Sequence, residues 1–441
     1  MISEKIRTPL KSFAEEIKSS SETAFLALLI LRLCVFFEGK INWTANETVM
    51  HIFSLILKFG TMLGCAGFLI YIIVRWKQPW KTKVFFLVPA IALFVLPIVY
   101  NVHGENTWYF AITDLFFCLM AYGKNYKKIL WCYLGVAFAG LAVAALGLPL
   151  GLTQERGKIA EATGFSLGIV YPNTWGQIAF LILVILWYFF LQKKKLVTLS
   201  IFLATALFMY LVPQCKTIAL LAAIFPFLTL LVKPRTQSSD DDRLLTKKHN
   251  KNIGSILLTI IPFVCFAITM ILCWQMDWVK KNAYGTDLES MAMRFVQGGI
   301  AFKHYGFRLI GHTVPNDPSV VYVVNGAEEV LYVVDNAFVT FGLFRGAIWM
   351  LWALCWLTYA NWKGLKNRDI ALAVISAFMM VFAIMERPGL EASYNFLFLY
   401  PLASVAYLKE PEEKFSFRTL FGIMDEQKPS VKKGNTTKKH K

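Results

Sequence analysis

Residues 253–275 read IGSILLTIIPFVCFAITMILCWQ, a run of mostly apolar residues that contains no charged side chain. The run follows the basic stretch Lys247-Lys248-His249-Asn250-Lys251 and ends before Met276-Asp277. A helix of about 20 apolar residues crosses the roughly 30 Å of hydrocarbon in a bilayer. The segment therefore predicts a transmembrane helix, and it is one of many such segments in the chain.

The whole chain has a composition that agrees with this segment. Of its 441 residues, 57% are hydrophobic, 15% are aromatic and only 17% are charged, and the mean hydropathy is +0.53. A soluble domain has about 25% charged residues, and a membrane β-barrel has short alternating segments instead of long apolar runs. The composition excludes a soluble enzyme, a β-barrel and a nucleic-acid-binding domain.

The apolar runs predict an all-α polytopic membrane protein with about twelve transmembrane helices. The fourth run is short and contains Asp114, which makes it the weakest of the set. The predicted spans are 23–37, 49–74, 84–100, 107–122, 129–148, 174–191, 196–212, 215–232, 253–275, 337–360, 369–386 and 391–408.

The distribution of basic residues predicts the orientation of these spans. Most of the 45 Lys and Arg residues lie in every second segment between successive spans. Segments rich in Lys and Arg stay in the cytoplasm. This gives a cytoplasmic N-terminal segment 1–22, a transmembrane domain 23–408, for which the resemblance described below implies a catalytic role, and a cytoplasmic basic tail 409–441. The net charge of +17 is then mostly an orientation signal, and it favours contact with anionic lipids.

Two connections on the opposite, extracytoplasmic side are long enough to form a site. They comprise residues 149–173 and residues 276–336, the second lying between spans 9 and 10. Loops of this length usually carry function or secondary structure of their own. Residues 288–303 have apolar side chains at helical spacing, which predicts an amphipathic helix within the longer connection.

Ionisable residues near the outer ends of the spans are the candidate functional residues. Placing a charge at the centre of a bilayer costs roughly 2.5–3.5 kcal/mol, so charges near hydrocarbon often mark functional sites. Several cations with one or two carboxylates and a histidine suit a substrate that carries a diphosphate. The candidates on this side are Arg156, Lys216, Arg294, His312, Asp335, Glu386 and Arg387.

Most of these residues also have a purely structural explanation. Asp335 and Asn173 could cap the helices that follow them. Lys216 could extend to the lipid headgroups, and Arg294 could lie on a solvated helix face. These alternatives remain open at this point.

Other signals point away from metal or cofactor chemistry. Arg32, Lys58 and Arg345 lie within spans but near their ends, where they are expected to pair or to extend to the interface. The sequence has no GxxxxGK[ST] phosphate loop and no HExxH motif. Neither a metal ion nor a cofactor is expected.

Three patches of the chain resemble the Wzy-type polymerases of O-antigen, capsule and exopolysaccharide repeat units, within the O-antigen ligase/polymerase superfamily. Gly164-Phe-Ser-Leu-Gly-Ile-Val-Tyr-Pro-Asn-Thr174 is similar to the family's Ser-Leu-Gly-Phe-x-His-Pro-Asn stretch. Gln214-Cys-Lys-Thr217 lies where many members have Ser-Arg-Thr. The third patch resembles the large outer loop and its exit, and it comprises Arg294, Leu309-Ile-Gly-His312 and Val334-Asp-Asn336, with Gly342 and Gly346 in the next span.

The chain also departs from this family pattern. Gly164 replaces an arginine that often precedes the Ser-Leu-Gly stretch, and Tyr171 replaces the histidine before Pro-Asn. Lys216 replaces the usual arginine, which keeps the charge but loses the bidentate fork.

The resemblance implies a metal-independent, GT-C-like glycosyltransferase of the cytoplasmic membrane, acting on its outer face. The substrates would be undecaprenyl-diphosphate-linked oligosaccharides, and the partners would include flippase and chain-length regulator proteins. Diphosphate binding would fall to Arg294, Lys216 and Arg156, with Asn173 and Arg387 as further substrate-binding residues. The catalytic base would be Asp335 or His312, with Glu386 as the third candidate.

Three other functions remain as alternatives. A ligase that transfers the finished glycan to another acceptor shares the same chemistry. A transporter of lipid-linked sugars would favour charges buried at the middle of the spans. A non-catalytic membrane assembly protein would not depend on the outer charges.

Overall fold

The structure is a computed structural model that describes residues 2–84, 107–155, 165–192, 194–230, 253–283, 289–309, 311, 321–324, 327–330, 335–367 and 369–406. Residues 85–100 of the third predicted span lie outside the described residues, and so does the basic tail 409–441.

The described chain is mostly helical, as the sequence predicts, with one small hairpin in the long connection 276–336. In this hairpin, two short strands pair antiparallel with Val321 opposite Val330. The elements in chain order are α1 (Ile2–Ser19), α2 (Glu22–Glu38), α3 (Glu47–Arg75), α5 (Thr107–Met120), α6 (Tyr126–Gly147), α7 (Pro172–Leu186), the π-helix η2 (Trp187–Leu191), α8 (Lys195–Leu211), α9 (Lys216–Leu230), α11 (Ile253–Trp274), α12 (Met276–Ala283), α13 (Glu289–Tyr305), β1 (Val321–Val324), β2 (Ala327–Val330), α14 (Ala337–Arg345), α15 (Ala347–Lys366), α16 (Ile370–Met385) and the 3₁₀ turns η3 (Arg387–Leu390) and η4 (Phe396–Phe398).

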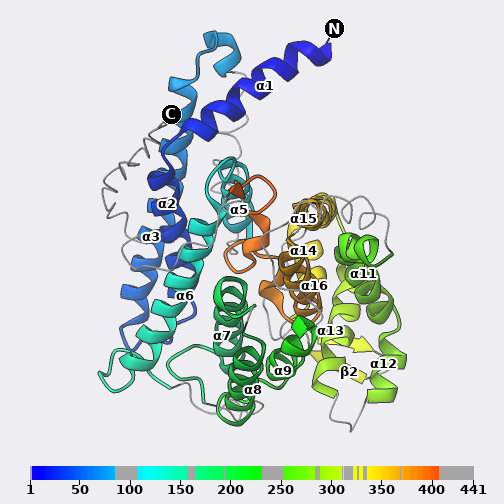
Figure 1. The fold of residues 1–441 in the computed structure, drawn as a ribbon. Coiled ribbons are helices and arrows are strands. Elements are labelled where there is room, and N and C mark those ends of the chain that lie inside the picture. The colour runs from blue at the N-terminus through cyan, green and yellow to red at the C-terminus, as the bar shows by residue number, and fades with distance from the viewer. Residues whose placement is uncertain are drawn as a thin grey trace, which may run out of the picture.

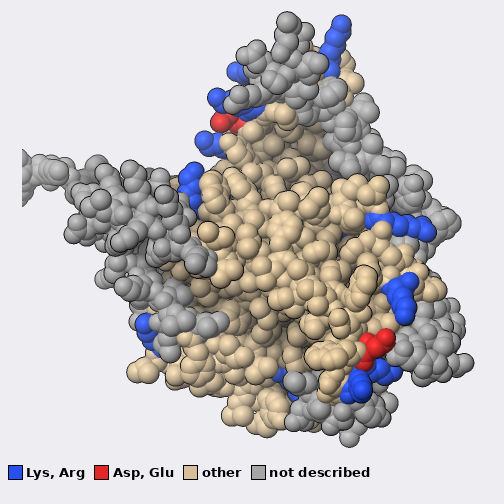
Figure 2. Space-filling model, turned by 90° about the vertical axis from the view of Figure 1, so that its right-hand side faces the viewer, with Lys and Arg blue, Asp and Glu red and all other residues tan. Residues whose placement is uncertain are grey.

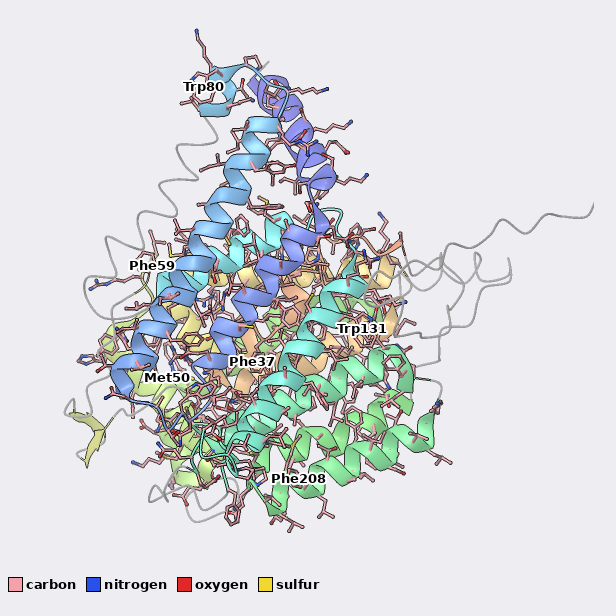
Figure 3. The ribbon with its side chains drawn as sticks, turned by 90° about the vertical axis from the view of Figure 1, so that its left-hand side faces the viewer. Phe37, Met50, Phe59, Trp80, Trp131 and Phe208 are labelled. Carbon is pink, nitrogen blue, oxygen red and sulfur yellow. The ribbon has the colours of Figure 1, made fainter. Side chains whose placement is uncertain are left out.

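The helices pack side by side around a continuous apolar core (Figure 1). On one side α2 contacts both α3 and α6, and on the other α11 contacts α13, α15 and α16. Figure 3 shows Phe37 covered between α2 and α6, whereas Phe59 lies on the exposed face of α3. In the centre, Phe225 of α9 contacts the rings of Phe180, Trp187 and Phe378. Aromatic packing therefore joins α7, α9 and α16.

The outer surface of several helices is apolar. Within the described residues, four helices are long and apolar enough to cross a membrane, or five if the bent pair of residues 9–19 and α2 counts as one span. Figure 2 shows a broad face without charge, with the described charged residues around its margins. On α11, Ile256, Leu257 and Ile271 are exposed. Together these features indicate a membrane protein.

Helix α1 meets α2 at a sharp bend of 82°. Ser21 begins α2 by accepting a hydrogen bond from the Ala24 amide at 3.2 Å, which satisfies one of the unpaired N–H groups of the first turn. The buried Lys124 ammonium donates to the carbonyls of Ile17 and Ser20 at 2.8 and 2.6 Å. These bonds connect the end of α1 to the connection before α6.

The predicted span 337–360 is interrupted, and the expectation of one continuous helix is wrong. The chain forms α14 and α15, which meet at Gly346 with φ 93° and ψ 170°. That conformation is accessible to glycine and costly for other residues. Apolar periodicity continues across residue 346, so the apolar pattern alone did not reveal the break.

The predicted helical span 391–408 is also wrong as a helix. Up to residue 406, where the described chain ends, it forms turns and the short η4, preceded by η3. Other elements supply partners for its carbonyl groups. Lys363 donates to Tyr400 and Ala403 at 3.1 and 2.7 Å, and Trp356 donates to Phe398 at 2.7 Å. Because side chains of a neighbouring helix donate to these carbonyl groups, they have hydrogen-bond partners without forming a helix.

The connection after α2 pairs with residues of the connection 149–173. The Asn42 amide donates to the Gly168 carbonyl at 2.8 Å, and Ile41 and Trp43 form isolated bridges with Ile169 and Thr153. Gly168 has φ 78°, and a Cβ at this position would overlap the Ala144 carbonyl. The Ser-Leu-Gly stretch of the chain therefore forms a tight turn against the end of α6.

Replacing Gly168 by alanine should destabilise the protein more than replacing Gly151, which has a similar φ of 68° but nothing within 4 Å of its Cβ position. Both substitutions incur a left-handed backbone cost of roughly 1–2 kcal/mol. Gly168→Ala adds a steric cost of about 1–3 kcal/mol. Thermal unfolding of the purified protein in detergent measures the difference. Equal losses for the two variants would contradict the close packing of this turn.

Candidate functional site

An ion-pair cluster forms where α13, the start of α14 and the end of α16 meet. Arg294 Nη1 lies 2.7 Å from Glu386 Oε1, and Arg294 Nε lies 3.8 Å from Asp335 Oδ2. Arg294 also donates to the Met385 carbonyl. The structure thus brings together three of the residues predicted from the sequence. The hypothesis that Arg294 lies on a solvated helix face is wrong, because its side chain is only 11% exposed.

The two carboxylates of this cluster differ in their surroundings. Both oxygens of Glu386 are engaged, Oε1 by Arg294 and Oε2 by the side-chain amide of Gln177 at 2.8 Å. The Glu386 side chain is 4% exposed, whereas that of Asp335 is 40% exposed. Glu386 is therefore held as a structural acceptor, and Asp335 is the carboxylate that a substrate could reach.

The pKa of Asp335 is raised from its ordinary value. Loss of hydration within the surrounding protein raises it, and the nearby guanidinium groups of Arg294 and Arg387 act in the opposite direction. A carboxylate with a raised pKa is a stronger proton acceptor than an ordinary aspartate, which suits a general base.

Gln177 belongs to the site, although the sequence did not identify it. It lies in α7, and its main-chain carbonyl accepts a hydrogen bond from the Tyr394 hydroxyl at 2.6 Å. An amide side chain within the otherwise apolar span 174–191 was the signal that could have found it. Through Gln177, α7 joins the segment after α16 to the cluster.

A second, fully buried group of charges lies nearby. Asp114 of α5 is 3.1 Å from Arg32 of α2 and 3.5 Å from Arg345 at the end of α14. Asp114 Oδ2 also accepts a hydrogen bond from the Ala392 amide at 3.2 Å. Of the two alternatives expected for these arginines, pairing or extending to the interface, the structure shows pairing. The sequence did not identify Asp114 as their common partner.

Two further cations lie at the edge of these groups, each over an aromatic ring. The Arg387 guanidinium carbon is 5.4 Å from the centroid of Phe344, and Lys40 Nζ is 5.4 Å from that of Phe36. Burial lowers the pKa of Lys40, while the Glu391 carboxylate raises it and Arg387 lowers it. Arg387 also lowers the pKa of Asp335, so its charge acts on the ion-pair cluster as well as on Lys40.

The remaining predicted residues are not part of this region or are not described. Lys216 is the exposed first residue of α9 and makes none of the ion pairs above. Asn173 lies in the first turn of α7 and does not cap it, and Asn336, not Asp335, caps α14. Arg156 and His312 lie outside the described residues.

No metal-ligand constellation is present in the described ranges, where no three His, Cys, Asp or Glu side chains are grouped.

No family model, curated protein or solved structure matches this chain. The arrangement of the side chains therefore carries the functional argument.

Replacing Asp114 by alanine should destabilise the protein by about 3–5 kcal/mol, because two buried guanidinium groups lose their shared carboxylate. The matched control is Glu15→Ala, which removes a carboxylate that lies 4.0 Å from Lys18 in an exposed pair. Such a surface pair contributes about 0–1 kcal/mol. Chemical denaturation in detergent compares the variants, and similar losses for both would argue against the buried charge group.

Proposed function

We propose that the chain is a membrane glycosyltransferase that polymerises undecaprenyl-diphosphate-linked oligosaccharide repeat units into a surface polysaccharide. The observation that carries this proposal is the half-exposed Asp335 beside Arg294, with Arg387 in electrostatic range. The carboxylate provides a proton acceptor, and the neighbouring guanidinium groups provide positive charge for a departing diphosphate.

The proposed reaction transfers the growing glycan from its lipid diphosphate to a hydroxyl of an incoming lipid-linked unit. The hydroxyl oxygen forms a new bond to the anomeric carbon, and the bond from that carbon to the diphosphate oxygen breaks. Asp335 takes the hydroxyl proton, and undecaprenyl diphosphate leaves with its negative charge balanced by the cations. The reaction needs no metal ion, because the side chains supply the charge stabilisation.

The proposal includes about twelve membrane crossings, which the apolar runs predict, and a GT-C-like architecture, which the resemblance to the Wzy-type polymerases implies. The irregular segment after α16 supports a final, non-helical crossing. It begins at Glu386 in the ion-pair cluster, and its Ser404 amide donates to the Lys124 carbonyl beside the start of α6 at 2.7 Å. The α6 helix leads from there to the outer connections over about 30 Å, which is the thickness of the hydrocarbon.

The proposed location is the cytoplasmic membrane, with both termini in the cytoplasm and the cluster on the outer face. Basic connections on the inner side would contact anionic lipids. Flippase and chain-length regulator proteins would supply the substrate and control the length of the product.

Asp335→Asn should reduce polymer formation by roughly 100-fold or more, because the amide cannot accept the hydroxyl proton. Glycan length on a gel measures this in cells that lack the gene and carry wild type, Asp335→Asn or Arg294→Ala. Membrane levels of each protein are compared in parallel. Single lipid-linked units are expected for both variants and for cells without the gene.

The control is Asp277→Asn, which changes an exposed carboxylate on α12 and should leave long polymer. If cells without the gene still accumulate long polymer on the lipid carrier but fail to transfer it to a final acceptor, the chain is a ligase. Normal polymer length with Asp335→Asn would exclude Asp335 as the base.

A further inference from the structure

The C-terminal end of α16 holds both partners of the Arg294–Asp335 ion pair. The last turn of a helix leaves carbonyl groups without partners inside the helix. Here the Asn336 side-chain amide donates to the Ile384 carbonyl at 2.7 Å, and Arg294 donates to the Met385 carbonyl. Because Asn336 directly follows Asp335 and caps α14, the main chain beside Asp335 and the guanidinium of Arg294 are fixed against the same helix end.

The Arg294 guanidinium is divided between two carboxylates. Its Nη1 lies 2.7 Å from Glu386 Oε1, and its Nε lies 3.8 Å from Asp335 Oδ2. An arginine beside a single carboxylate often engages both oxygens in a fork-to-fork pair. At Glu386 the Gln177 side-chain amide binds Oε2 at 2.8 Å, so Arg294 pairs with Oε1 and its Nε faces Asp335.

Gln177 is itself held in a fixed position. Its side chain is buried in α7, and its main-chain carbonyl accepts a hydrogen bond from the Tyr394 hydroxyl at 2.6 Å. One residue earlier, a Cβ on Gly176 would lie only 3.0 Å from the Cβ and Sγ atoms of Cys215. The Cys215 thiol also donates to the Pro172 carbonyl at 2.9 Å. The first turns of α7 therefore pack closely against the residue before α9, which keeps the Gln177 amide at Glu386.

The ionisable groups around Asp335 and Glu386 come from several elements. Within the described residues, the groups whose charge interacts with these carboxylates are Arg294 of α13, Arg387 of η3, the Tyr394 hydroxyl after η3 and the Cys215 thiol before α9. Loss of hydration raises the pKa of Asp335, and the two arginines lower it. The share of the Arg294 charge that Asp335 receives therefore affects how tightly Asp335 binds a proton.

We infer that Gln177 is a positioning residue, which holds Glu386 to one nitrogen of Arg294 and thereby keeps Arg294 beside Asp335. Without this amide, the released Glu386 oxygen would attract a second nitrogen of Arg294, and Asp335 would lose part of its cation. Asp335 would then bind its proton more tightly, and the base would work only at higher pH. This inference rests on the proposed function, because it names the residue that adjusts the proposed base.

Gln177→Met removes the amide and keeps the length of the side chain, so Asp335 should titrate at higher pH than in wild type. Glu386→Gln should shift the titration to lower pH, because it keeps an oxygen for Arg294 and removes the competing negative charge. Infrared difference spectra of the full-length protein in lipid nanodiscs measure these titrations. The carboxyl band of Asp335 is identified as the band that Asp335→Asn lacks.

The matched control is Asn361→Leu, which removes another buried amide, one that donates to the Leu258 carbonyl of α11 at 2.9 Å. Asp335 should titrate in this control as in wild type, and a shift as large as that of Gln177→Met would overturn the inference. Thermal unfolding checks that each variant is folded. If Gln177→Met does not fold, Glu386→Gln decides, and a titration of Asp335 that does not move to lower pH overturns the inference.

The same variants are assayed for polymer formation, with lipid-linked repeat units extracted from cells that lack the gene. On the acidic side of the pH profile, Gln177→Met should be about tenfold slower than wild type, the effect of a weakened cation beside an aspartate. The profile of Glu386→Gln should move in the opposite direction. A purely structural role of Gln177 would lower the rate at every pH without moving the profile.

The two measurements separate the inference from the proposed function. If Asp335 titrates equally in wild type and in folded Gln177→Met, the inference is wrong, while the proposed function stands as long as the wild-type rate follows that titration. If the titrations shift as expected but the rates do not follow them, Gln177 is a positioning residue and Asp335 is not the base. If wild type forms no polymer from the extracted units, the proposed function is wrong, and the titrations alone decide the role of Gln177.

Discussion

The region around the ion-pair cluster depends on one buried carboxylate, that of Asp114, held between Arg32 and Arg345. Each of these charges would be costly to bury alone, and together they compensate one another. The group joins α2, α5 and α14, and through the Ala392 amide it also holds the irregular segment that follows α16. Because that segment begins at Glu386, the position of the ion-pair cluster depends on the same buried charges.

The site combines a rigid part with an accessible part. Glu386 is surrounded by donors from α7 and α13 and is almost fully buried, so it holds these elements together. The Asp335 side chain is 40% exposed and lies at the margin, where a ligand can replace water around it. Rigid support behind an accessible charged group is the arrangement expected for preorganised electrostatic stabilisation.

Much of the helical framework could be predicted from the sequence, because long apolar runs between charged clusters have few other structures available. Counting the spans by parity predicted that Arg294 and Glu386 share one side of the membrane, but the sequence did not predict that they form an ion pair. The irregular path of 391–406 could not be predicted, because its hydrogen-bond partners, such as Lys363, lie on distant helices. The pairing of Lys40 with Val170 was missed for the same reason, since it joins two connections that are distant in the sequence.

The irregular segment after α16 has a consequence for how the protein is made. A backbone without helical hydrogen bonds is unstable in lipid unless protein surrounds it. In the proposed topology, this segment cannot partition into the bilayer by itself as it leaves the ribosome. It acquires its path only after α6 and α15 have assembled and offer Tyr133, Trp356 and Lys363 as donors. In that topology, biogenesis includes a post-insertion step, in which this segment is threaded into an already assembled bundle.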